Sequence, residues 1–176
     1  MGTARGAART GFGICLQRGA ARGGIVEIAR LRDHPELIPE VAGWIYKEFP
    51  YAFVGESLRA WIEAVAYGQL DGSLTTFVIL ERGSPLATAS LDLEDLPSYP
   101  HLSPWLASVY TRPEHRGKGL AGMLFAEIEK EARGRGFDRI YLYTTDQEAF
   151  YRKRGWETLE GSRLDGEPTV VMRKVL

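Results

Sequence analysis

The sequence predicts a single α/β (α+β) domain, built as one mixed, mainly antiparallel sheet of six to seven strands with helices on both faces. Its 176 residues suit one domain with one sizeable core. Segments of strand-like alternation interleave with segments of helical period, in the order β α α β β β α β α β β. Neighbouring strands are mostly joined by short turns, which favours antiparallel pairing over parallel crossovers.

The first half of the chain supplies one strand, two helices and a hairpin. Residues 25–31 alternate between apolar and polar side chains and predict a strand. Apolar residues recur at helical spacing from Leu37 to Phe49, which predicts a helix that ends near Pro50. Ser57 is a suitable N-cap for a second helix. Two strands are then expected on either side of a turn, and they are "SLTTFVILE" and "LATASLDLE".

The second half begins with a proline-rich loop and continues with alternating strands and helices. "WLASVYT" (105–111) and "RIYLYT" (139–144) predict strands on either side of a helix that runs from Gly119 to about Arg133. A short helix follows from Asp146, whose side chain is expected to cap it. A final hairpin turns at Asp165–Gly166, and its strands are "WETLEGSRL" and "TVVMRKVL".

The first 24 residues differ from the rest of the chain. No acidic residue precedes Glu27, and the segment carries several arginines. Arginine-rich, acid-poor leaders are typical of organellar transit peptides, but those are also rich in serine, which is absent here. We therefore expect residues 1–24 to be a disordered leader and residues 25–176 to be the domain.

Composition excludes several classes of function. The formal net charge is −1, so no global basic field indicates a nucleic-acid partner. No apolar run approaches the roughly 18 residues of a membrane span. The single cysteine, Cys15, has no partner for an internal disulfide or a CxxC metal site, so we expect no metal and a cytoplasmic location.

The segment "HRGKGLAG" (115–122) is the strongest functional signal. Glycines let a backbone approach an anion closely, and the free N–H groups of a helix's first turn, with its dipole, attract negative charge. Arg116 and Lys118 add local positive charge, so the segment predicts a pyrophosphate cradle. A Walker loop is excluded because Leu120 stands where Ser or Thr is needed, and the strand order does not suit a dinucleotide fold. The alternatives are a solvated turn or another nucleotide ligand.

At this point the sequence resembles a known family. "VYTRPEHRGKGLAGMLFAEIEKEA" is similar to the acyl-CoA-binding motif of the GNAT superfamily of N-acetyltransferases, whose core pattern is matched by Arg116, Gly119 and Ala121. Thr111 replaces the valine that is usual in the preceding strand. "AFYRKRGW" (149–156) resembles the family's second signature. The resemblance is strong over residues 105–176 and extends to the rest only through the order of elements.

The resemblance implies a reaction and a set of binding residues. It implies a GNAT-like sheet with splayed central strands, and transfer of an acetyl group from acetyl-CoA, the cosubstrate, to a primary amine of a small molecule or of a peptide or protein N-terminus. The pantetheine arm would lie along an unpaired strand edge, and a backbone N–H there, such as that of Val109, would polarise the thioester. The implied cofactor-binding residues are Val109, Tyr110, Thr111, Arg116, Gly117, Lys118, Gly119, Leu120, Ala121 and Gly122.

Two residues are candidates for proton transfer. Tyr151 falls in the second signature and could donate to the leaving thiolate, although a packing role is the alternative. Family members often carry a glutamate on the strand that bears Val109, but this strand has Ser108 and no acid. His101 is the candidate base because an imidazole is the side chain suited to proton exchange near neutral pH, with a solvated or structural histidine as the alternative. Asp92, Glu94 and Asp95 also lie on or after the neighbouring strand.

Several alternatives stay open at this stage. A catalytically silent acyl-CoA-binding or sensing module would use the same loop without turnover. The expected partners are acetyl-CoA and an amine acceptor, with no nucleic acid and no membrane, and a homodimer is left open because family members are often dimers. An acidic acceptor groove would favour polyamines or aminoglycosides, whereas a basic groove would favour acidic peptide termini. Aromatic residues around the break between the first two helices are expected to wall this groove, and they are Trp44, Tyr46, Phe49, Tyr51 and Phe53.

Overall fold

The computed structural model describes residues 18–21, 24–164 and 166–176, which contain one sheet of eight strands in the order β1-β2-β3-β4-β5-β6-β8-β7. All neighbouring strands are antiparallel except β5 and β6. The strands are β1 (Arg18–Ala21), β2 (Gly24–Arg30), β3 (Leu74–Glu81), β4 (Ser84–Asp92), β5 (Trp105–Thr111), β6 (Arg139–Thr144), β7 (Glu157–Leu164) and β8 (Glu167–Val175).

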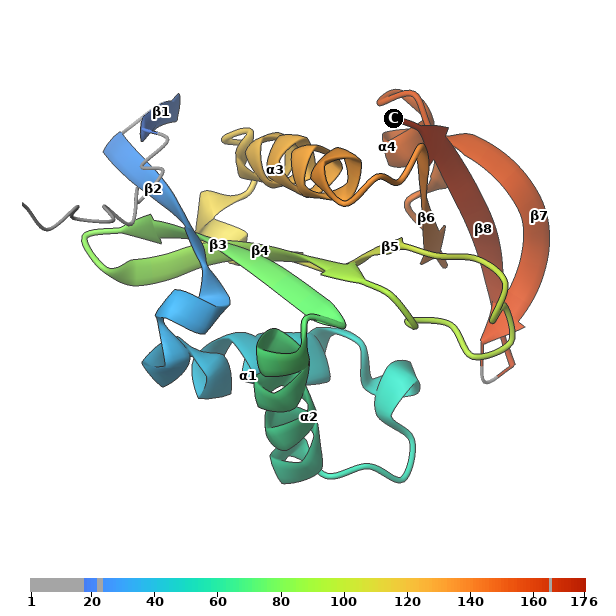
Figure 1. Ribbon diagram of the computed structural model, residues 1–176, viewed down its shortest axis with the longest axis horizontal. Coiled ribbons are helices and arrows are strands. Elements are labelled where there is room, and N and C mark those ends of the chain that lie inside the picture. Colours follow the sequence, from blue (N-terminus) through green and yellow to red (C-terminus); the bar gives the residue numbers. More distant parts are fainter. Residues whose placement is uncertain (1–17, 22–23, 165) are drawn as a thin grey trace, which may run out of the picture.

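Helices cover both faces of the sheet (Figure 1). Four α-helices are described: α1 (Ile38–Glu48), α2 (Leu58–Asp71), α3 (Leu120–Gly134) and α4 (Glu148–Arg152). Helix α3 lies on one face, where Leu124 and Ile128 are fully buried within the main core. Helices α1 and α2 lie on the other face and bury Val41 and Val65 in a second cluster. The predicted fold class is confirmed by this arrangement.

Two local expectations differ from the structure. Residues 18–21, which we assigned to a leader, form β1 and pair with β2, while residues 1–17 and 22–23 of that expected leader lie outside the described residues. The expected cap by Asp146 is wrong: α4 begins at Glu148, and its N-cap Gln147 has no side-chain cap bond. Instead the Thr144 hydroxyl accepts the Gln147 N–H at 3.0 Å, which leaves the Asp146 carboxylate outside the helix end.

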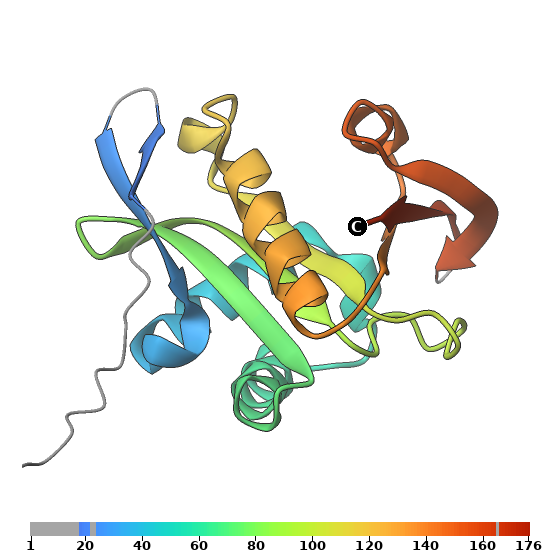
Figure 2. The same ribbon diagram turned by 45° about the horizontal axis from the view of Figure 1, so that its top comes forward.

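The sheet divides between β5 and β6 (Figure 2). Their parallel pairing consists of the single residue pair Trp105↔Tyr141, supported by a 2.9 Å bond from the Tyr141 N–H to the Pro104 carbonyl. Beyond that pair the strands diverge, as the resemblance implied. On its other side β5 is irregular, because Ser108 has a φ of 52° and the register with β4 shifts between Thr88 and Ser90. One edge of β5 is therefore left unpaired beyond its first residue.

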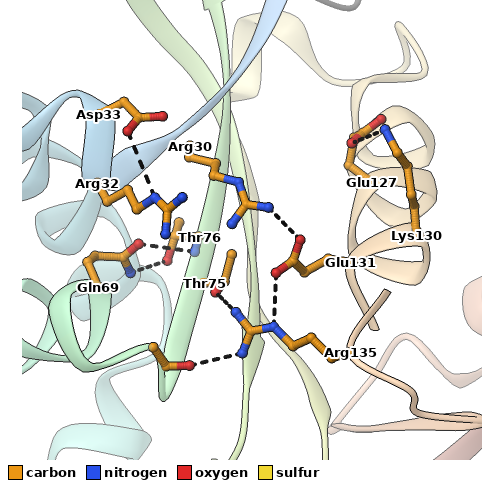
Figure 3. Close-up of polar contacts among 11 residues, drawn as sticks. Arg30, Arg32, Asp33, Gln69, Thr75, Thr76, Glu127, Lys130, Glu131 and Arg135 are labelled. Atoms are coloured by element: carbon orange, nitrogen blue, oxygen red, sulfur yellow. Dashed lines mark hydrogen bonds and ion pairs between the residues drawn. The ribbon is translucent and has the colours of Figure 1, made fainter. Parts of the chain in front are cut away.

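A polar network joins the C-terminal end of α3 to strands β2 and β3 (Figure 3). Glu131 accepts bonds from Arg30 of β2 and from Arg135, at 2.5 and 2.9 Å. Arg135 also donates to the Gly72 carbonyl and to the Thr75 hydroxyl. Partial burial raises the pKa of Glu131, but its two guanidinium partners outweigh that effect and hold the pKa below its usual value. The network therefore stabilises the fold through a charged carboxylate.

We expect Glu131→Gln to lower the free energy of unfolding by about 1–2 kcal/mol, because it weakens two charge-assisted hydrogen bonds that are only partly screened by solvent. The full difference in unfolding free energy between wild type and variant should be present at neutral pH. Since the folded pKa of Glu131 lies below its unfolded value, the difference between wild type and variant should shrink as pH falls below about 4. Urea denaturation at several pH values measures this.

The matched control is Glu63→Gln, which removes the same charge from an exposed ion pair with Arg59 on α2. Such exposed pairs contribute little, so its unfolding free energy should stay within about 0.5 kcal/mol of wild type. Equal losses in both variants would contradict a stabilising role for the Glu131 network.

Candidate active site

The predicted phosphate loop is an open backbone bend at the start of α3. Gly119 is the N-cap of this 15-residue helix, with a φ of 83°, and Gly117 has a φ of 76°. Apart from the adjoining backbone, no heavy atom of the described residues lies within 4 Å of the position that a Cβ would take at Gly117, Gly119 or Gly122. Leu120, in contrast, is buried in the main core and fixes the first turn in place. The bend therefore presents N–H groups to solvent without cover from other described residues, which fits an anion.

The two cations of the bend lie at its surface. Arg116 donates through Nε to the Thr111 carbonyl at 3.0 Å, and its guanidinium lies 3.2 Å from a carboxylate oxygen of Glu48. Its side chain and that of Glu48 are 52% and 42% exposed, so this ion pair is weak and readily exchanged for another anion. Lys118 Nζ lies 3.3 Å from Nδ1 of His115. Both cations can reach a phosphate at this bend.

The unpaired edge of β5 connects the bend to the point where the sheet divides. Val109 packs against the main core and Tyr110 contacts Trp44 with ring centroids 5.3 Å apart. Neither Ser108 nor Val109 has a register partner in β4. An extended amide-bearing ligand can pair with such an edge as an added strand. Ala121, on the first turn of α3, also packs against the core, so this end of the site is rigid.

Tyr151 lies on α4 on the same face of the sheet as α3. It is 9% exposed and packs against Phe125, Phe150 and Trp156. Burial raises the pKa of Tyr151 to about 12, opposed by Arg154 and reinforced by Asp146 and Tyr51. The hydroxyl is therefore protonated throughout the physiological range and can act as a hydrogen-bond donor.

On the opposite face, four titratable residues from separate segments form what we call the acidic face. They are Tyr51, Asp92, Asp95 and Tyr143. Burial raises the pKa of Tyr143, and Asp95, Tyr51 and Asp92 raise it further. Burial also raises the pKa of Tyr51, a polar contact with Thr145 lowers it, and Asp146, Asp95 and Glu48 raise it. Each of the four residues therefore lies within electrostatic range of at least one other.

The two carboxylates of the acidic face differ in their surroundings. Burial raises the pKa of Asp92, which is partly offset because one carboxylate oxygen accepts the Glu94 N–H at 2.9 Å. Burial, followed by the charge of Asp92, raises the pKa of Asp95 to about 8. Asp95 is half-buried in the loop that follows β4. One of these two groups is thus a carboxyl that exchanges its proton near neutral pH.

The remaining candidates from the sequence are His101 and the five aromatic residues expected around the break between the first two helices. His101 is exposed in the loop between β4 and β5, and its ring centroid lies 6.1 Å from that of Tyr99. Of the five aromatic residues expected to wall a groove, Tyr46 and Phe53 stack on each other, and Phe53 also packs against Trp61 of α2. Of these five residues, Tyr51 belongs to the acidic face, where it raises the pKa of Tyr143.

A hollow of about 570 Å³ lies along the β7–β8 hairpin. It begins at Thr145, the residue in contact with Tyr51, and its lining includes the hydroxyls of Ser162 and Thr169 together with Arg163. The Arg163 guanidinium is already bonded to the Gly166 carbonyl at 2.7 Å. The hollow therefore has a partly polar lining.

The sequence analysis did not name Tyr143 as a site residue, and it named Asp95 only as one of three acids on or after the neighbouring strand. The signal for Tyr143 is its place in "RIYLYT", where it shares a strand face with Tyr141 and alternates with the core residue Leu142. The signal for Asp95 is the position of "DLED" directly after a strand that borders the site. Within the described residues, no cluster of His, Cys, Asp and Glu has the arrangement of a metal site, and no helix combines the length and apolarity that a membrane crossing needs.

Comparisons with known proteins agree with this geometry. The sequence profile of the acetyltransferase (GNAT) family matches residues 38–156. A GCN5-related N-acetyltransferase from Ralstonia eutropha is 25% identical, with a TM-score of 0.57, over 78% of this chain and 97% of its own. None of the curated proteins matches the sequence.

Two further solved structures share the fold. The PaiA N-acetyltransferase from Thermoplasma acidophilum, solved in complex with coenzyme A, is 20% identical over 86% of this chain and 99% of its own, with a TM-score of 0.60. A ribosomal-protein-alanine N-acetyltransferase from Brucella melitensis is 21% identical over 81% and 96%, with a TM-score of 0.62. Together with the family profile, they support acyl transfer from a CoA-type cosubstrate as the general activity. The chain belongs to the acetyltransferase (GNAT) family.

Proposed function

We propose that this protein transfers the acetyl group of acetyl-CoA to a primary amine. The observation that carries the proposal is the unpaired edge of β5, which runs from the open glycine bend to the point where the sheet divides. A diphosphate at the bend and an amide-bearing arm along this edge would bring a thioester toward Trp105. Acetyl-CoA supplies such an activated acetyl thioester.

The residues of this chain then have distinct roles. The N–H groups at the start of α3, with Arg116 and Lys118, hold the diphosphate. The Val109 N–H stabilises the negative charge that develops on the thioester oxygen. The Tyr151 phenol donates a hydrogen bond to the leaving sulfur. Because its pKa is about 12 and that of a thiol is about 8.5, it stabilises the thiolate without fully giving up its proton.

We expect Tyr151→Phe to lower kcat about a hundredfold and to leave CoA affinity unchanged, because the variant keeps the aromatic packing and loses only the donor. Detection of free thiol during turnover with a panel of amines measures kcat, and calorimetry measures CoA binding. The matched control is Tyr67→Phe, at an exposed tyrosine of α2, which should retain full activity.

Unchanged turnover in Tyr151→Phe would remove the phenol from the mechanism. Saturable CoA binding by the wild type, with no thiol release for any amine, would instead identify a catalytically silent acyl-CoA-binding module. The two results are distinct because the first requires turnover and the second excludes it.

We expect Arg116→Ala to weaken CoA binding about tenfold, equivalent to about 1.4 kcal/mol, since a charge-assisted contact to the diphosphate is lost. Binding of pantetheine, which lacks the diphosphate, should not change. Arg59→Ala removes the same charge from an exposed site on α2 and should leave both affinities unaltered. Equal weakening of CoA and pantetheine binding would show that Arg116 acts on the loop fold rather than on the phosphates.

Within amine acceptors, the charges near the acidic face favour a small cationic amine over an acidic peptide terminus. Asp146 raises the pKa of Tyr51 and Asp92 raises that of Tyr143, so both carboxylates lie near this face. We expect kcat/KM to be about tenfold higher for cadaverine, with two ammonium groups, than for pentylamine, with one. An ω-amino acid of the same chain length should be the poorest substrate of the three. A preference for the amino acid would contradict this assignment of acceptor class.

A further inference from the structure

A small cavity lies under β4 and β5, between the sheet and the helices α1 and α2. Its volume is about 10 Å³, which is at the lower limit of the space that one water molecule needs. The apolar part of its lining comes mainly from α1 and α2. The sheet side of the lining carries four hydroxyl groups, from Thr76, Thr88, Ser90 and Ser108. The cavity is therefore polar on the side of the sheet.

Three of these hydroxyl groups are buried, and two of them belong to a short hydrogen-bonded row. The side-chain amide of Gln69 on α2 donates to the Thr76 hydroxyl at 2.9 Å, and its carbonyl accepts the Thr76 N–H at 3.2 Å (Figure 3). The Thr76 hydroxyl lies 2.8 Å from the hydroxyl of Ser90. Such groups are normally satisfied when they are buried, so each of their protons needs an acceptor.

This row leaves one hydroxyl proton over. The hydroxyls of Thr76 and Ser90 share a single bond, which uses only one of their two protons, and no acceptor among the described residues takes the other. The Thr88 hydroxyl donates to the Phe77 carbonyl at 3.2 Å and keeps its lone pairs to accept. The Ser108 hydroxyl has no hydrogen-bond partner within the described residues. The cavity thus offers a donor, an acceptor and a hydroxyl that can be either.

Ser108 also determines the backbone geometry of the proposed reaction site. Ser108 and Val109 of β5 stand opposite the single β4 residue Ala89, which is a β-bulge. The φ of 52° at Ser108 is costly for a residue other than glycine and persists only where its surroundings hold it. Its side chain lines the cavity, whereas Val109 packs in the main core on the other face. Because the peptide group between them is planar, the conformation of Ser108 sets the direction of the Val109 N–H.

We propose that the cavity binds one water molecule and that this water holds Ser108, which makes Ser108 a positioning residue for the Val109 N–H. The water accepts the remaining proton of the Thr76–Ser90 pair and bonds to the hydroxyls of Thr88 and Ser108. Three partners are typical of a buried water, and a polar lining distinguishes a hydrated cavity from a dry one. The inference rests on the proposed acetyl transfer, in which the Val109 N–H stabilises the thioester oxygen.

A high-resolution crystal structure of the full chain tests the water site without reference to activity. We expect electron density for one water within hydrogen-bond distance of the Ser108 hydroxyl and of the Thr76–Ser90 pair. A cavity with no such density would overturn the proposal, and so would a Ser108 hydroxyl that bonds directly to another protein group.

Kinetic measurements on two serine variants test the positioning role. Ser108→Ala should lower kcat about tenfold and leave CoA affinity nearly unchanged, because a misdirected oxyanion donor is lost mainly in the transition state. Ser90→Ala should have the same effect from a residue inside the core, since it breaks the row that holds the water. The matched control is Ser84→Ala, at the exposed start of β4, which should keep the kcat of wild type.

Ser108→Gly separates this role from a general loss of stability. Glycine adopts a φ of 52° without cost, so this variant should resist urea better than Ser108→Ala. Its kcat should nevertheless stay reduced, because it also lacks the hydroxyl. A kcat at the level of wild type in Ser108→Gly or in Ser108→Ala would overturn the positioning role.

These results are distinguishable from failure of the proposed function. That failure would appear as a wild type that binds CoA and releases no thiol with any amine. It would overturn the positioning role of Ser108 as well, whereas the crystal structure would still decide whether the cavity binds a water.

Discussion

The single residue pair Trp105↔Tyr141 is the constraint on which the site depends. It holds β5 and β6 together at one end and lets them separate along the rest of their length. Both halves of the sheet must be stable without further pairing there. Helix α3 supports one half through the main core, and the β4–β5 loop closes the other by packing on Trp105, Tyr141 and Val171. The open edge is thus maintained by packing on both faces.

The divided sheet also separates two electrostatic environments. On the α3 face, the free N–H groups of the helix start and the exposed cations favour anions. On the other face, carboxylates and phenols with raised pKa values favour cations and proton exchange. Tyr151 belongs to the first face, yet Asp146 and Tyr51 raise its pKa. The two environments therefore meet at the phenol, where a reaction between an anionic carrier and a cationic acceptor would need them to meet.

The sequence was sufficient for most of the fold, because its elements are separated by strong local signals. The strands 105–111 and 139–144 were predicted with their observed bounds, and Ser57 caps α2 as expected, with its hydroxyl accepting the Ala60 N–H at 3.2 Å. The strand β1 was not predicted, since its four residues carry no alternation of apolar side chains and depend on pairing with β2. Such tertiary pairing leaves no local pattern.

The candidate site was less accessible to sequence reasoning. The phosphate bend has a contiguous signature, so Gly117 and Gly119 could be identified directly, and their positive φ values agree with that role. The acidic face has no such signature, because it joins β4, β6 and the turn Pro50–Phe53 across the chain. The raised pKa values of its members depend on how closely these segments approach one another, which is a property of the assembled fold.

The ion pair between Arg116 and Glu48 links the two environments in a further way. An anion that binds Arg116 withdraws the cation that neutralises Glu48, whose charge also acts on Tyr51. If an anion at the glycine bend drew Arg116 away, the Glu48 carboxylate would be left without this partner beside Tyr51. A positively charged second ligand would gain from that change, and by thermodynamic reciprocity it would strengthen the binding of the first. Under the proposed function, this exposed salt bridge would couple the two binding events.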